Sequence, residues 1–168
     1  MPNVMRNIVA VLSILLIGAS ASAQGRKVSI DKSITGFTFE HTEGDGTIIY
    51  TQKDYNSYQE NESFACISIM PFPPGLTIED GVLGIEDEVE KSRSEGAIIS
   101  DFKKEVVSFG GYSATAISMH VEENGAASAA FIAFIDAGGE FYVYIGEDVK
   151  NGNHMDKIRQ TLKTFKIN

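Results

Sequence analysis

The stretch that decides the fold is FACISIM, residues 64–70. In an extended strand, successive side chains point to opposite faces of the sheet. Both faces of this strand are therefore apolar, with Phe64, Cys66 and Met70 on one side and Ala65, Ile67 and Ile69 on the other. A strand of this kind needs cover on both sides, which predicts elements packed over each face of the sheet. Prolines at positions 71, 73 and 74 end it, because proline has no N–H to donate.

Strand patterns with a period of two precede and follow this stretch. An apolar series with polar neighbours begins at Ile34, turns at residues 44–46 (Gly-Asp-Gly) and returns through Thr47–Gln52, which predicts a hairpin. After Ile98, four more strands follow with short connections, which favours a meander. The four expected strands are Phe102–Phe109, Tyr112–Val121, Ala126–Asp136 and Glu140–Asp148.

Two segments have apolar residues at the spacing of an amphipathic helix. Thr77 and Asp80 predict a capping box at the start of the first, whereas Gly81 and Gly84 should weaken it by up to about 1 kcal/mol each. Asn153 is the expected N-cap of the second helix. The two apolar stripes are Ile78, Val82, Ile85 and Val89, and Met155, Ile158, Leu162 and Phe165.

Helices set onto a mostly antiparallel sheet define the α+β class. We therefore predict one domain, residues 24–168, with an antiparallel sheet of about six or seven strands flanked by two helices. A chain of this length can bury a hydrophobic core large enough for stability without disulfide bonds. Its single cysteine, Cys66, has no partner for an internal disulfide.

The first 23 residues have the three-part organisation of a secretory signal peptide. A start with one basic residue, Arg6, precedes the apolar run Ile8–Ile17, and Ala-Ser-Ala at positions 21–23 predicts cleavage before Gln24. The run is shorter than the roughly 20 apolar residues that span a bilayer. We therefore expect an exported protein, periplasmic or extracellular, without an integral membrane segment after cleavage.

The expected mature part is strongly acidic. It holds all 23 acidic residues and 13 of the 14 Lys and Arg residues, since only Arg6 lies in the leader, so its formal net charge is −10. Such a surface repels phosphate backbones and anionic lipids. The composition therefore argues against nucleic-acid binding and against electrostatic docking to a membrane.

The order of elements resembles the PsbP/DcrB-like family of small exported or envelope-associated domains, over residues 36–168. The features that carry the resemblance are the step Gly110–Ala114 (GGYSA), the Asn124-Gly125 turn, the strand Glu140–Ile145 (EFYVYI) and the closing segment from Ile158 to Ile167. The resemblance implies an antiparallel sheet between helices. It also implies an accessory subunit, chaperone or binding protein, and supplies no shared catalytic residues.

Two His-x-Glu pairs, His41 with Glu43 and His120 with Glu122, lie near expected strand ends. Residues two apart on a strand share a face, so each pair could present an imidazole and a carboxylate together. If the two strands were neighbours, a metal site with two histidines and two carboxylates could form. Solvated polar pairs at strand ends are the simpler interpretation.

A nucleophile is not supported by the sequence. Ser113 follows a glycine, but Thr115 stands where a nucleophile elbow needs glycine, inside an expected strand. Cys66 lies in the strand that is apolar on both faces, and a buried apolar thiol is inert. We therefore predict that Cys66 belongs to the core.

Two further groups could bind a partner. The acidic residues of the first helix could contact a basic partner or bind calcium. They lack the Asp-x-Asp-x-Asp-Gly loop of a calcium site, so we expect them to form a solvated face. The tyrosines on or beside the loop before residue 64 could bind a sugar or a peptide if their rings are exposed. The alternative is that they cover the edge of the sheet. These groups are Glu86, Asp87, Glu88 and Glu90, and Tyr50, Tyr55 and Tyr58.

We therefore expect a non-catalytic binding or accessory protein of the cell envelope that acts through contacts with a protein partner. No metal, cofactor or catalytic residue is assigned. The alternatives are a metal-dependent or hydrolytic enzyme built on the His-x-Glu pairs, and a carrier with a small-ligand pocket between one helix and the sheet.

Overall fold

The computed structural model describes residues 28–59, 62–123, 125–150 and 153–168. The expected signal peptide and Asn124 of the expected turn lie outside the described residues. The elements are β1 (Val28–Ser29), β2 (Phe39–Thr42), β3 (Ile48–Thr51), the 3-10 helix η1 (Tyr55–Ser57), β4 (Phe64–Pro71), α2 (Ile78–Ser94), β5 (Ile98–Phe109), β6 (Tyr112–Glu123), β7 (Ala126–Asp136), β8 (Phe141–Val149), α3 (Met155–Leu162) and β9 (Lys166–Ile167).

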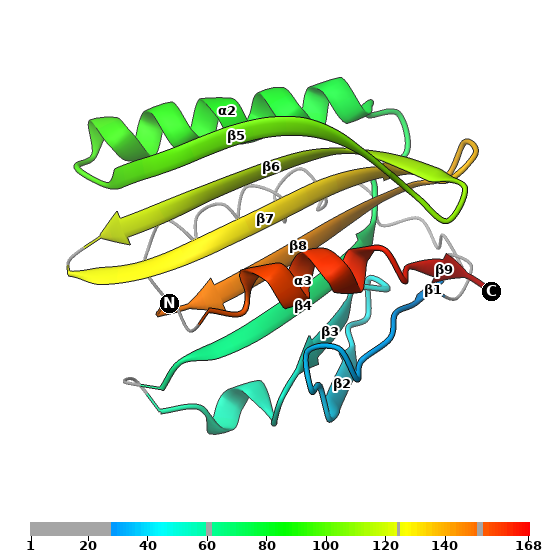
Figure 1. The fold of residues 1–168 in the computed structure, drawn as a ribbon. Coiled ribbons are helices and arrows are strands. Elements are labelled where there is room, and N and C mark those ends of the chain that lie inside the picture. The colour runs from blue at the N-terminus through cyan, green and yellow to red at the C-terminus, as the bar shows by residue number, and fades with distance from the viewer. Residues whose placement is uncertain (1–27, 60–61, 124, 151–152) are drawn as a thin grey trace.

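Seven strands form one antiparallel sheet in the order β2-β3-β4-β8-β7-β6-β5 (Figure 1). The predicted hairpin, β2 with β3, and the predicted meander, β5 to β8, are both confirmed. β4 joins these two units because it pairs with β8 from Phe64 opposite Val149 to Pro71 opposite Tyr142. The strand that is apolar on both faces therefore lies inside the sheet.

Both faces of β4 are buried, as predicted. Cys66 is 6% exposed and Ile67 is fully buried. Met70 packs in one cluster with residues of α2, whereas Ile67 and Ile69 pack in a second cluster with residues of α3. The segment therefore has the two-sided cover that its sequence requires.

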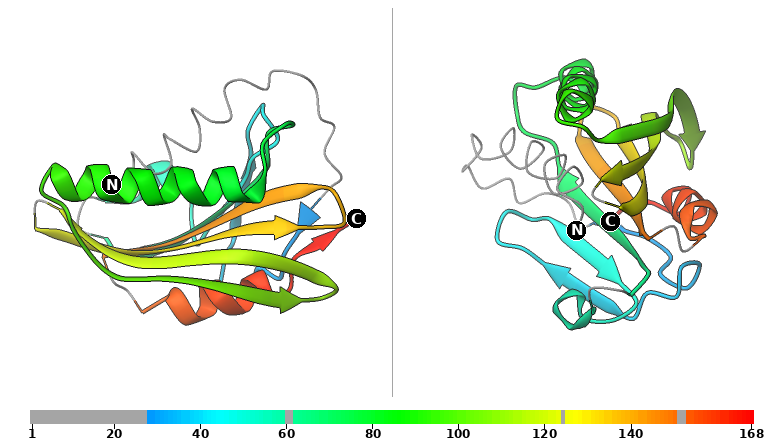
Figure 2. Two further views of the ribbon diagram at one scale, coloured as in Figure 1. Left: turned by 90° about the horizontal axis from the view of Figure 1, so that it is seen from above. Right: turned by 90° about the vertical axis from the view of Figure 1, so that its left-hand side faces the viewer.

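The two helices lie on opposite faces of the sheet (Figure 2). α2 contacts β5, β6 and β7 on one face, and α3 contacts β7 and β8 on the other. The predicted α+β architecture of about seven strands and two helices is confirmed. A small sheet of β1 and β9, in which Val28 lies opposite Ile167, was not predicted.

α2 begins with the predicted capping box. The Asp80 N–H donates to Thr77 Oγ1 at 3.1 Å, and the Thr77 N–H donates to Asp80 Oδ2 at 2.8 Å. Gly81 is buried and faces β7, where an added β-carbon would be 2.5 Å from Cε1 of Phe134. Gly81 therefore allows the helix to approach the sheet closely, in addition to its cost in helix propensity.

The predicted cap of α3 is wrong. Asn153 has a φ of 61°, and the N-cap residue is His154, whose side chain makes no capping hydrogen bond. The carboxylate of Asp148 replaces such a cap, because Asp148 Oδ2 accepts the His154 N–H at 2.7 Å. A strand residue therefore satisfies one of the free donors at the start of this helix.

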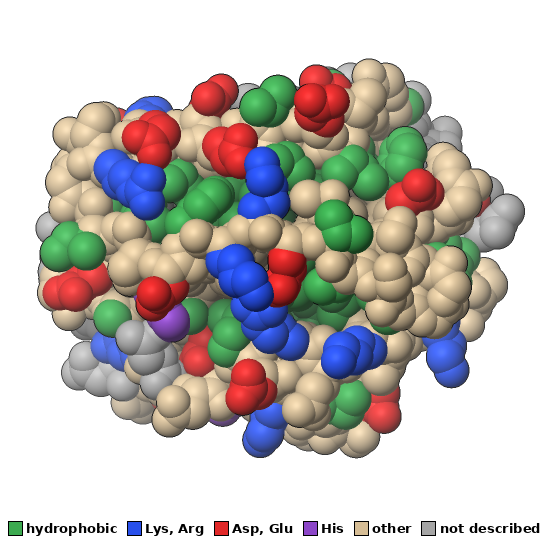
Figure 3. Space-filling model, turned by 45° about the horizontal axis from the view of Figure 1, so that its top comes forward, with side chains coloured by type: hydrophobic (Ala, Val, Ile, Leu, Met, Phe, Trp, Pro, Cys, Tyr) green, Lys and Arg blue, Asp and Glu red, His purple; other side chains and the backbone are tan. Residues whose placement is uncertain are grey.

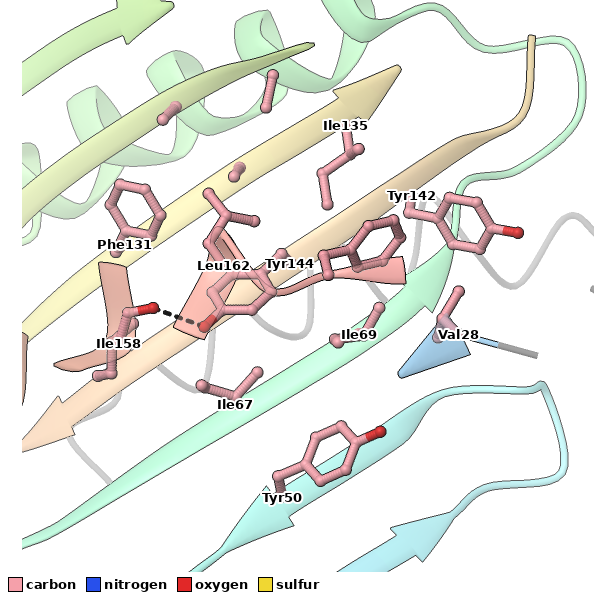
Figure 4. Packing of buried hydrophobic residues seen from close by; sticks show 14 of the residues in the cluster. Val28, Tyr50, Ile67, Ile69, Phe131, Ile135, Tyr142, Tyr144, Ile158 and Leu162 are labelled. Carbon is pink, nitrogen blue, oxygen red and sulfur yellow. Dashed lines mark hydrogen bonds between the residues drawn. The ribbon is translucent and has the colours of Figure 1, made fainter. Parts of the chain in front are cut away.

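Four contacts hold α3 on the sheet. The Tyr144 hydroxyl donates to the carbonyl of Ile158 at 2.8 Å (Figure 4). Arg159 donates to Glu105 on β5 at 2.8 Å, and its guanidinium lies 4.6 Å from the ring centre of Phe131. Ile158 packs directly on Gly146, where an added β-carbon would overlap its side chain.

Candidate functional site

The first His-x-Glu pair lies at an edge of the sheet. His41 is on β2, and its Nε2 lies 3.4 Å from Glu43 Oε1 just beyond the strand. Both side chains are about half exposed. The pair is local and solvated, in agreement with the simpler interpretation of the sequence.

The second pair does not form, because His120 contacts a different carboxylate. His120 Nδ1 lies 2.9 Å from Asp101 Oδ2 across the β5–β6 ladder. Asp101 occupies the irregular step between Ser100 and Lys103 and has a φ of 53°. This contact could not be predicted from the sequence, since a β-bulge is not visible in the alternation of residues.

The two pairs lie far apart, so the metal site that neighbouring strands would have allowed does not form from them. Four strands separate β2 from β6 in the sheet, so their axes lie roughly 24 Å apart at a strand spacing of about 4.8 Å. Within the part of the chain that the structure describes, no three His, Cys, Asp or Glu side chains group closely enough to hold a metal ion.

His120 faces a shallow pocket of about 290 Å³ at the ends of β5, β6 and β7. Its side chain is 51% exposed, and that of Asp101 is 76% exposed. Water therefore competes for both groups, and the pair is worth little to stability. The pocket is lined by Ile98, Ser100, His120, Val121, Glu122, Ala127 and Ser128.

Ser113 and Cys66, which the sequence does not support as nucleophiles, both lie in the sheet. Ser113 lies on β6, where it faces Ser108 on one side and Asp136 on the other, instead of at a strand-to-helix turn. Cys66 is buried, and this burial, together with the nearby Glu147 carboxylate, raises the pKa of its thiol far above the ordinary value. Cys66 therefore belongs to the core, as predicted.

Neither Tyr50 nor Tyr58 is an exposed side chain. The side chain of Tyr55 lies outside the described residues. Tyr50 is 2% exposed, stacks on Phe37 and packs among the residues shown in Figure 4, and burial raises its pKa to about 12. Tyr58 is partly buried, stacks on Phe64 with ring centres 4.0 Å apart and lies near Lys53. Tyr50 cannot take part in binding at the surface, so the binding hypothesis for this group is wrong in that respect.

The acidic residues of α2 are only partly the solvated face that the sequence suggested. Glu86 pairs with Lys104 of β5 at 2.7 Å, and Glu90 pairs with Arg93 at 2.6 Å. Glu88 is 5% exposed, so it does not belong to a solvated face.

Sequence reasoning missed a set of buried polar side chains that we call the α2-side polar set. Each has one oxygen that is shielded from water and has no hydrogen-bond partner among the described residues. The oxygens are Oε1 of Glu88, Oγ of Ser92, Oγ of Ser128 and Oε2 of Glu147. Burial of Glu147, which is 3% exposed, raises the pKa of its carboxyl to about 7.

A second feature is the exposed apolar side chains of α2 and β5. Among the described residues, the exposed large hydrophobic side chains are Leu83 on α2 and Ile98 and Val106 on β5. Figure 3 shows hydrophobic side chains exposed between charged ones on the side of the molecule where α2 and β5 lie. β5 is an edge strand of the sheet.

Within the described residues, no helix has both the length and the apolar character needed to cross a membrane.

No family model matches the chain, and no curated protein sequence matches it. Among solved structures, the chain is similar to cyanobacterial PsbP (CyanoP) from Synechocystis sp. PCC 6803, with a TM-score of 0.50 and 11% identity over 89% of this chain and 98% of that one. This likeness shows that the fold is PsbP-like, as the resemblance in the sequence implied.

Two other solved structures are similar at lower scores. A protein from Bacteroides thetaiotaomicron VPI-5482 has a TM-score of 0.45 and 13% identity, over 77% of this chain and 41% of that one. A Pseudomonas aeruginosa protein of unknown function, PA94, has a TM-score of 0.43 and 13% identity, over 85% of this chain and 84% of that one.

Proposed function

We propose that the protein is a non-catalytic, exported binding or accessory protein of the cell envelope that docks a protein partner along β5. The observation that carries the proposal is that Val106 of the edge strand β5 and Leu83 of α2, the helix that covers the same face, both expose large hydrophobic side chains. Ile98 of β5 is also exposed but points to the other face, because its neighbour Ile99 packs with α2. Exposed apolar groups that gather on one side of a molecule mark interaction surfaces. The signal-like leader supports the expected location.

The backbone of β5 suits the addition of a strand. β5 pairs with β6 on one side, and its ladder is regular from Lys103 to Phe109. An edge strand presents unpaired N–H and C=O groups along its other side. An extended segment of a partner can pair with these groups and gain affinity from main-chain hydrogen bonds.

The side chains of β5 define the kind of segment that fits. Lys104 pairs with Glu86 of α2, so Val106, two residues later, points to the same face of the sheet as α2. Val106 is 76% exposed, and Leu83 on α2 is 50% exposed. We therefore expect the added segment to carry apolar side chains on the α2 face.

A photo-crosslinking amino acid tests this surface in the native envelope. It replaces Ser108, which is exposed on β5 and shares the face of Val106, and in a matched control it replaces Thr42, which is exposed on the opposite edge strand β2. Mass spectrometry then identifies the crosslinked peptide. We expect an adduct with an extended segment of one protein at Ser108 and no such adduct at Thr42.

The second arm adds Val106→Lys to the Ser108 probe. Val106 is exposed, so the substitution should leave stability nearly unchanged while it places a charge in the apolar contact. Loss of the adduct supports docking along β5. An adduct that survives Val106→Lys, equal labelling from Thr42, or no adduct from either position contradicts the proposal.

A further inference from the structure

The shallow pocket beside His120 opens on the face of the sheet opposite α2, at the start of β5. His120 follows Met119, which packs with residues of α2, so the His120 side chain points to the other face. Ser100 lies directly opposite His120, and Ile98 and Glu122 form the next pair on that face. Four of the residues that line the pocket therefore share one face of the sheet.

The pocket combines an apolar wall with negative charge. Ile98 is 62% exposed, and it lines the pocket together with Ala127. Glu122 is an exposed carboxylate in the lining. A second exposed carboxylate, Asp101, lies 2.9 Å from Nδ1 of His120. A cation with an apolar stem matches both properties of this surface.

The size and position of the pocket suit one side chain of a protein partner. Pockets for small-molecule ligands have volumes of about 300–1,000 Å³, whereas this one has about 290 Å³ and is shallow. The β5 ladder is regular from Lys103 to Phe109 and is irregular between Ser100 and Lys103. A bulge ends regular pairing. A partner strand added along Lys103–Phe109 would therefore end beside the pocket.

We propose that the pocket binds an arginine side chain of the protein partner that docks along β5. A guanidinium has five N–H donors in a planar fork, and the Glu122 carboxylate in the lining is a matching acceptor. The methylene stem of the arginine gains apolar contact with Ile98, and the flat face of its guanidinium can pack on the His120 ring. The partner as the source of the arginine rests on the proposed docking along β5.

The charges around the pocket distinguish arginine from other side chains. A carboxylate would be repelled by Glu122 and Asp101, and an apolar side chain would gain nothing from them. A lysine ammonium is more strongly hydrated than a guanidinium and has no bidentate fork. One cation, Lys150, lines a neighbouring hollow of about 250 Å³ that shares Ala127 with the pocket. Two carboxylates therefore lie at this end of the sheet against one lysine.

A titration followed by ¹H–¹⁵N NMR on the purified protein tests the pocket without the partner. The probe is N-acetyl-arginine-N′-methylamide, and the control ligand is the neutral citrulline compound of the same shape. We expect saturable shifts of the His120, Glu122 and Ala127 signals with the arginine probe. Its Kd should be on the order of millimolar, since the contact is exposed. The citrulline compound should bind at least about fivefold more weakly, because it has no charge.

Two exposed carboxylates provide a matched pair of variants. Glu122→Gln should weaken binding of the arginine probe about fivefold, since it removes a charged acceptor and keeps the size of the side chain. Glu43→Gln is the control, because Glu43 also lies beside a histidine, His41, at the opposite edge of the sheet. It should leave binding unchanged. Both carboxylates are exposed, so both variants should keep the fold.

The titration has several outcomes that would overturn the proposal. Equal affinity for the arginine and citrulline compounds would show that charge is not recognised. Shifts around His41 as large as those around His120 would show general attraction to an acidic protein. Absence of shifts at the pocket, or unchanged affinity in Glu122→Gln, would also overturn it.

Crosslinking in the native envelope identifies the source of the arginine. The photo-crosslinking amino acid replaces Lys103, which is exposed and points away from α2 because Lys104 points toward it. We expect an adduct with the protein that the Ser108 probe labels. The labelled segment should have an arginine within roughly four residues of the crosslinked position, which is about 13 Å of extended chain.

The failure of this proposal can be told apart from the failure of docking. A labelled segment without a nearby arginine, or an adduct at Ser108 with none at Lys103, would overturn the arginine site and leave docking along β5 intact. Adducts at neither position would overturn docking and the partner as the source. The titration would then still show whether the pocket recognises a guanidinium.

Discussion

Gly81 of α2 lies so close to Phe134 of β7 that a β-carbon on Gly81 would be 2.5 Å from Cε1 of the ring. We predict that Gly81→Ala destabilises the fold by about 1–2 kcal/mol, because overpacking against the ring outweighs a gain of up to about 1 kcal/mol in helix propensity. Urea unfolding followed by circular dichroism measures the change. In a Phe134→Leu background the cost should shrink, whereas a stabilised Gly81→Ala protein would contradict the close packing.

Stability should decrease as the pH rises from about 4.5 to about 7, because of Glu147. Burial raises the pKa of this carboxyl from 4.5 to about 7, so the folded state keeps its proton over a range in which the unfolded chain has lost it. The loss should be at most about 3 kcal/mol and should level off above pH 7. Unfolding curves at a series of pH values measure it, and Glu147→Gln should abolish the decrease.

Carboxyl groups with lowered pKa values act in a different pH range. Hydrogen bonds lower the pKa of Asp31, Asp80 and Glu105, so their stabilisation is present at neutral pH and is lost as the pH falls through their folded pKa values. These losses occur below about pH 4.5. If the decrease in stability between pH 4.5 and 7 persists in Glu147→Gln, a titratable group other than Glu147 causes it.

Cys66 should be unreactive in the folded protein. Burial raises the pKa of its thiol, and little thiolate is then present to attack a reagent. We expect labelling by a maleimide to be slow in buffer and to become fast in denaturing urea, with mass spectrometry as the readout. Equal rates in both conditions would show that β4 is open to solvent.

Asp148→Ala should loosen α3, since Asp148 accepts the backbone N–H of His154 at the start of this helix. Loss of an N-capping carboxylate costs about 1 kcal/mol, with values up to about 2. Hydrogen exchange should accelerate across Met155–Leu162, while α2 serves as an internal reference. Unchanged protection of α3 would show that this hydrogen bond does not hold the helix.

The leader should be removed between Ala23 and Gln24 when the protein is expressed in its native host. The Ala-Ser-Ala pattern at positions 21–23 predicts cleavage at this bond. The intact mass and N-terminal sequence of the protein from a cell-envelope or periplasmic fraction measure it. A protein that retains Met1, or that is found in the cytoplasmic fraction, would contradict export.

Local patterns were sufficient to predict most of the fold. The alternation in residues 64–70 specified a strand buried on both faces, and short turns between later strands specified a meander. The capping box of Thr77 and Asp80 formed as expected, because both partners lie within one turn of helix. Each of these signals is contained in a few neighbouring residues.

Features that depend on distant residues were not predicted. The prediction of Asn153 as the cap of α3 is wrong, because the carboxylate that accepts the free N–H of His154, Asp148, belongs to a strand. The two His-x-Glu pairs are held apart because β4 pairs with β8 and places both units in one wide sheet. Sequence periodicity does not encode the order of strands that are remote along the chain.

Burial of polar side chains was the other source of error. Glu88 belongs to an acidic run, which predicted a solvated face, and no pattern around Glu147 predicted that its carboxyl is buried. The burial of these two carboxyl groups depends on the orientation of α2 and on the register of β8, which residues distant in the sequence determine. Tyr50 was misplaced for the same reason, since its ring stacks on Phe37 from a separate segment.

The pairing of β4 with β8 also has a consequence for the rate of folding. Ser63 Oγ donates to the carbonyl of Val149 at 3.0 Å across 86 positions of sequence, at the point where this ladder begins. Contacts of such high sequence separation form late, because the loop between them must close first. The β5–β8 meander can form from local pairings. We therefore expect the apolar β4 to pair only after β8 has joined this meander. Late formation of this ladder would keep the chain open for translocation in the export that we propose.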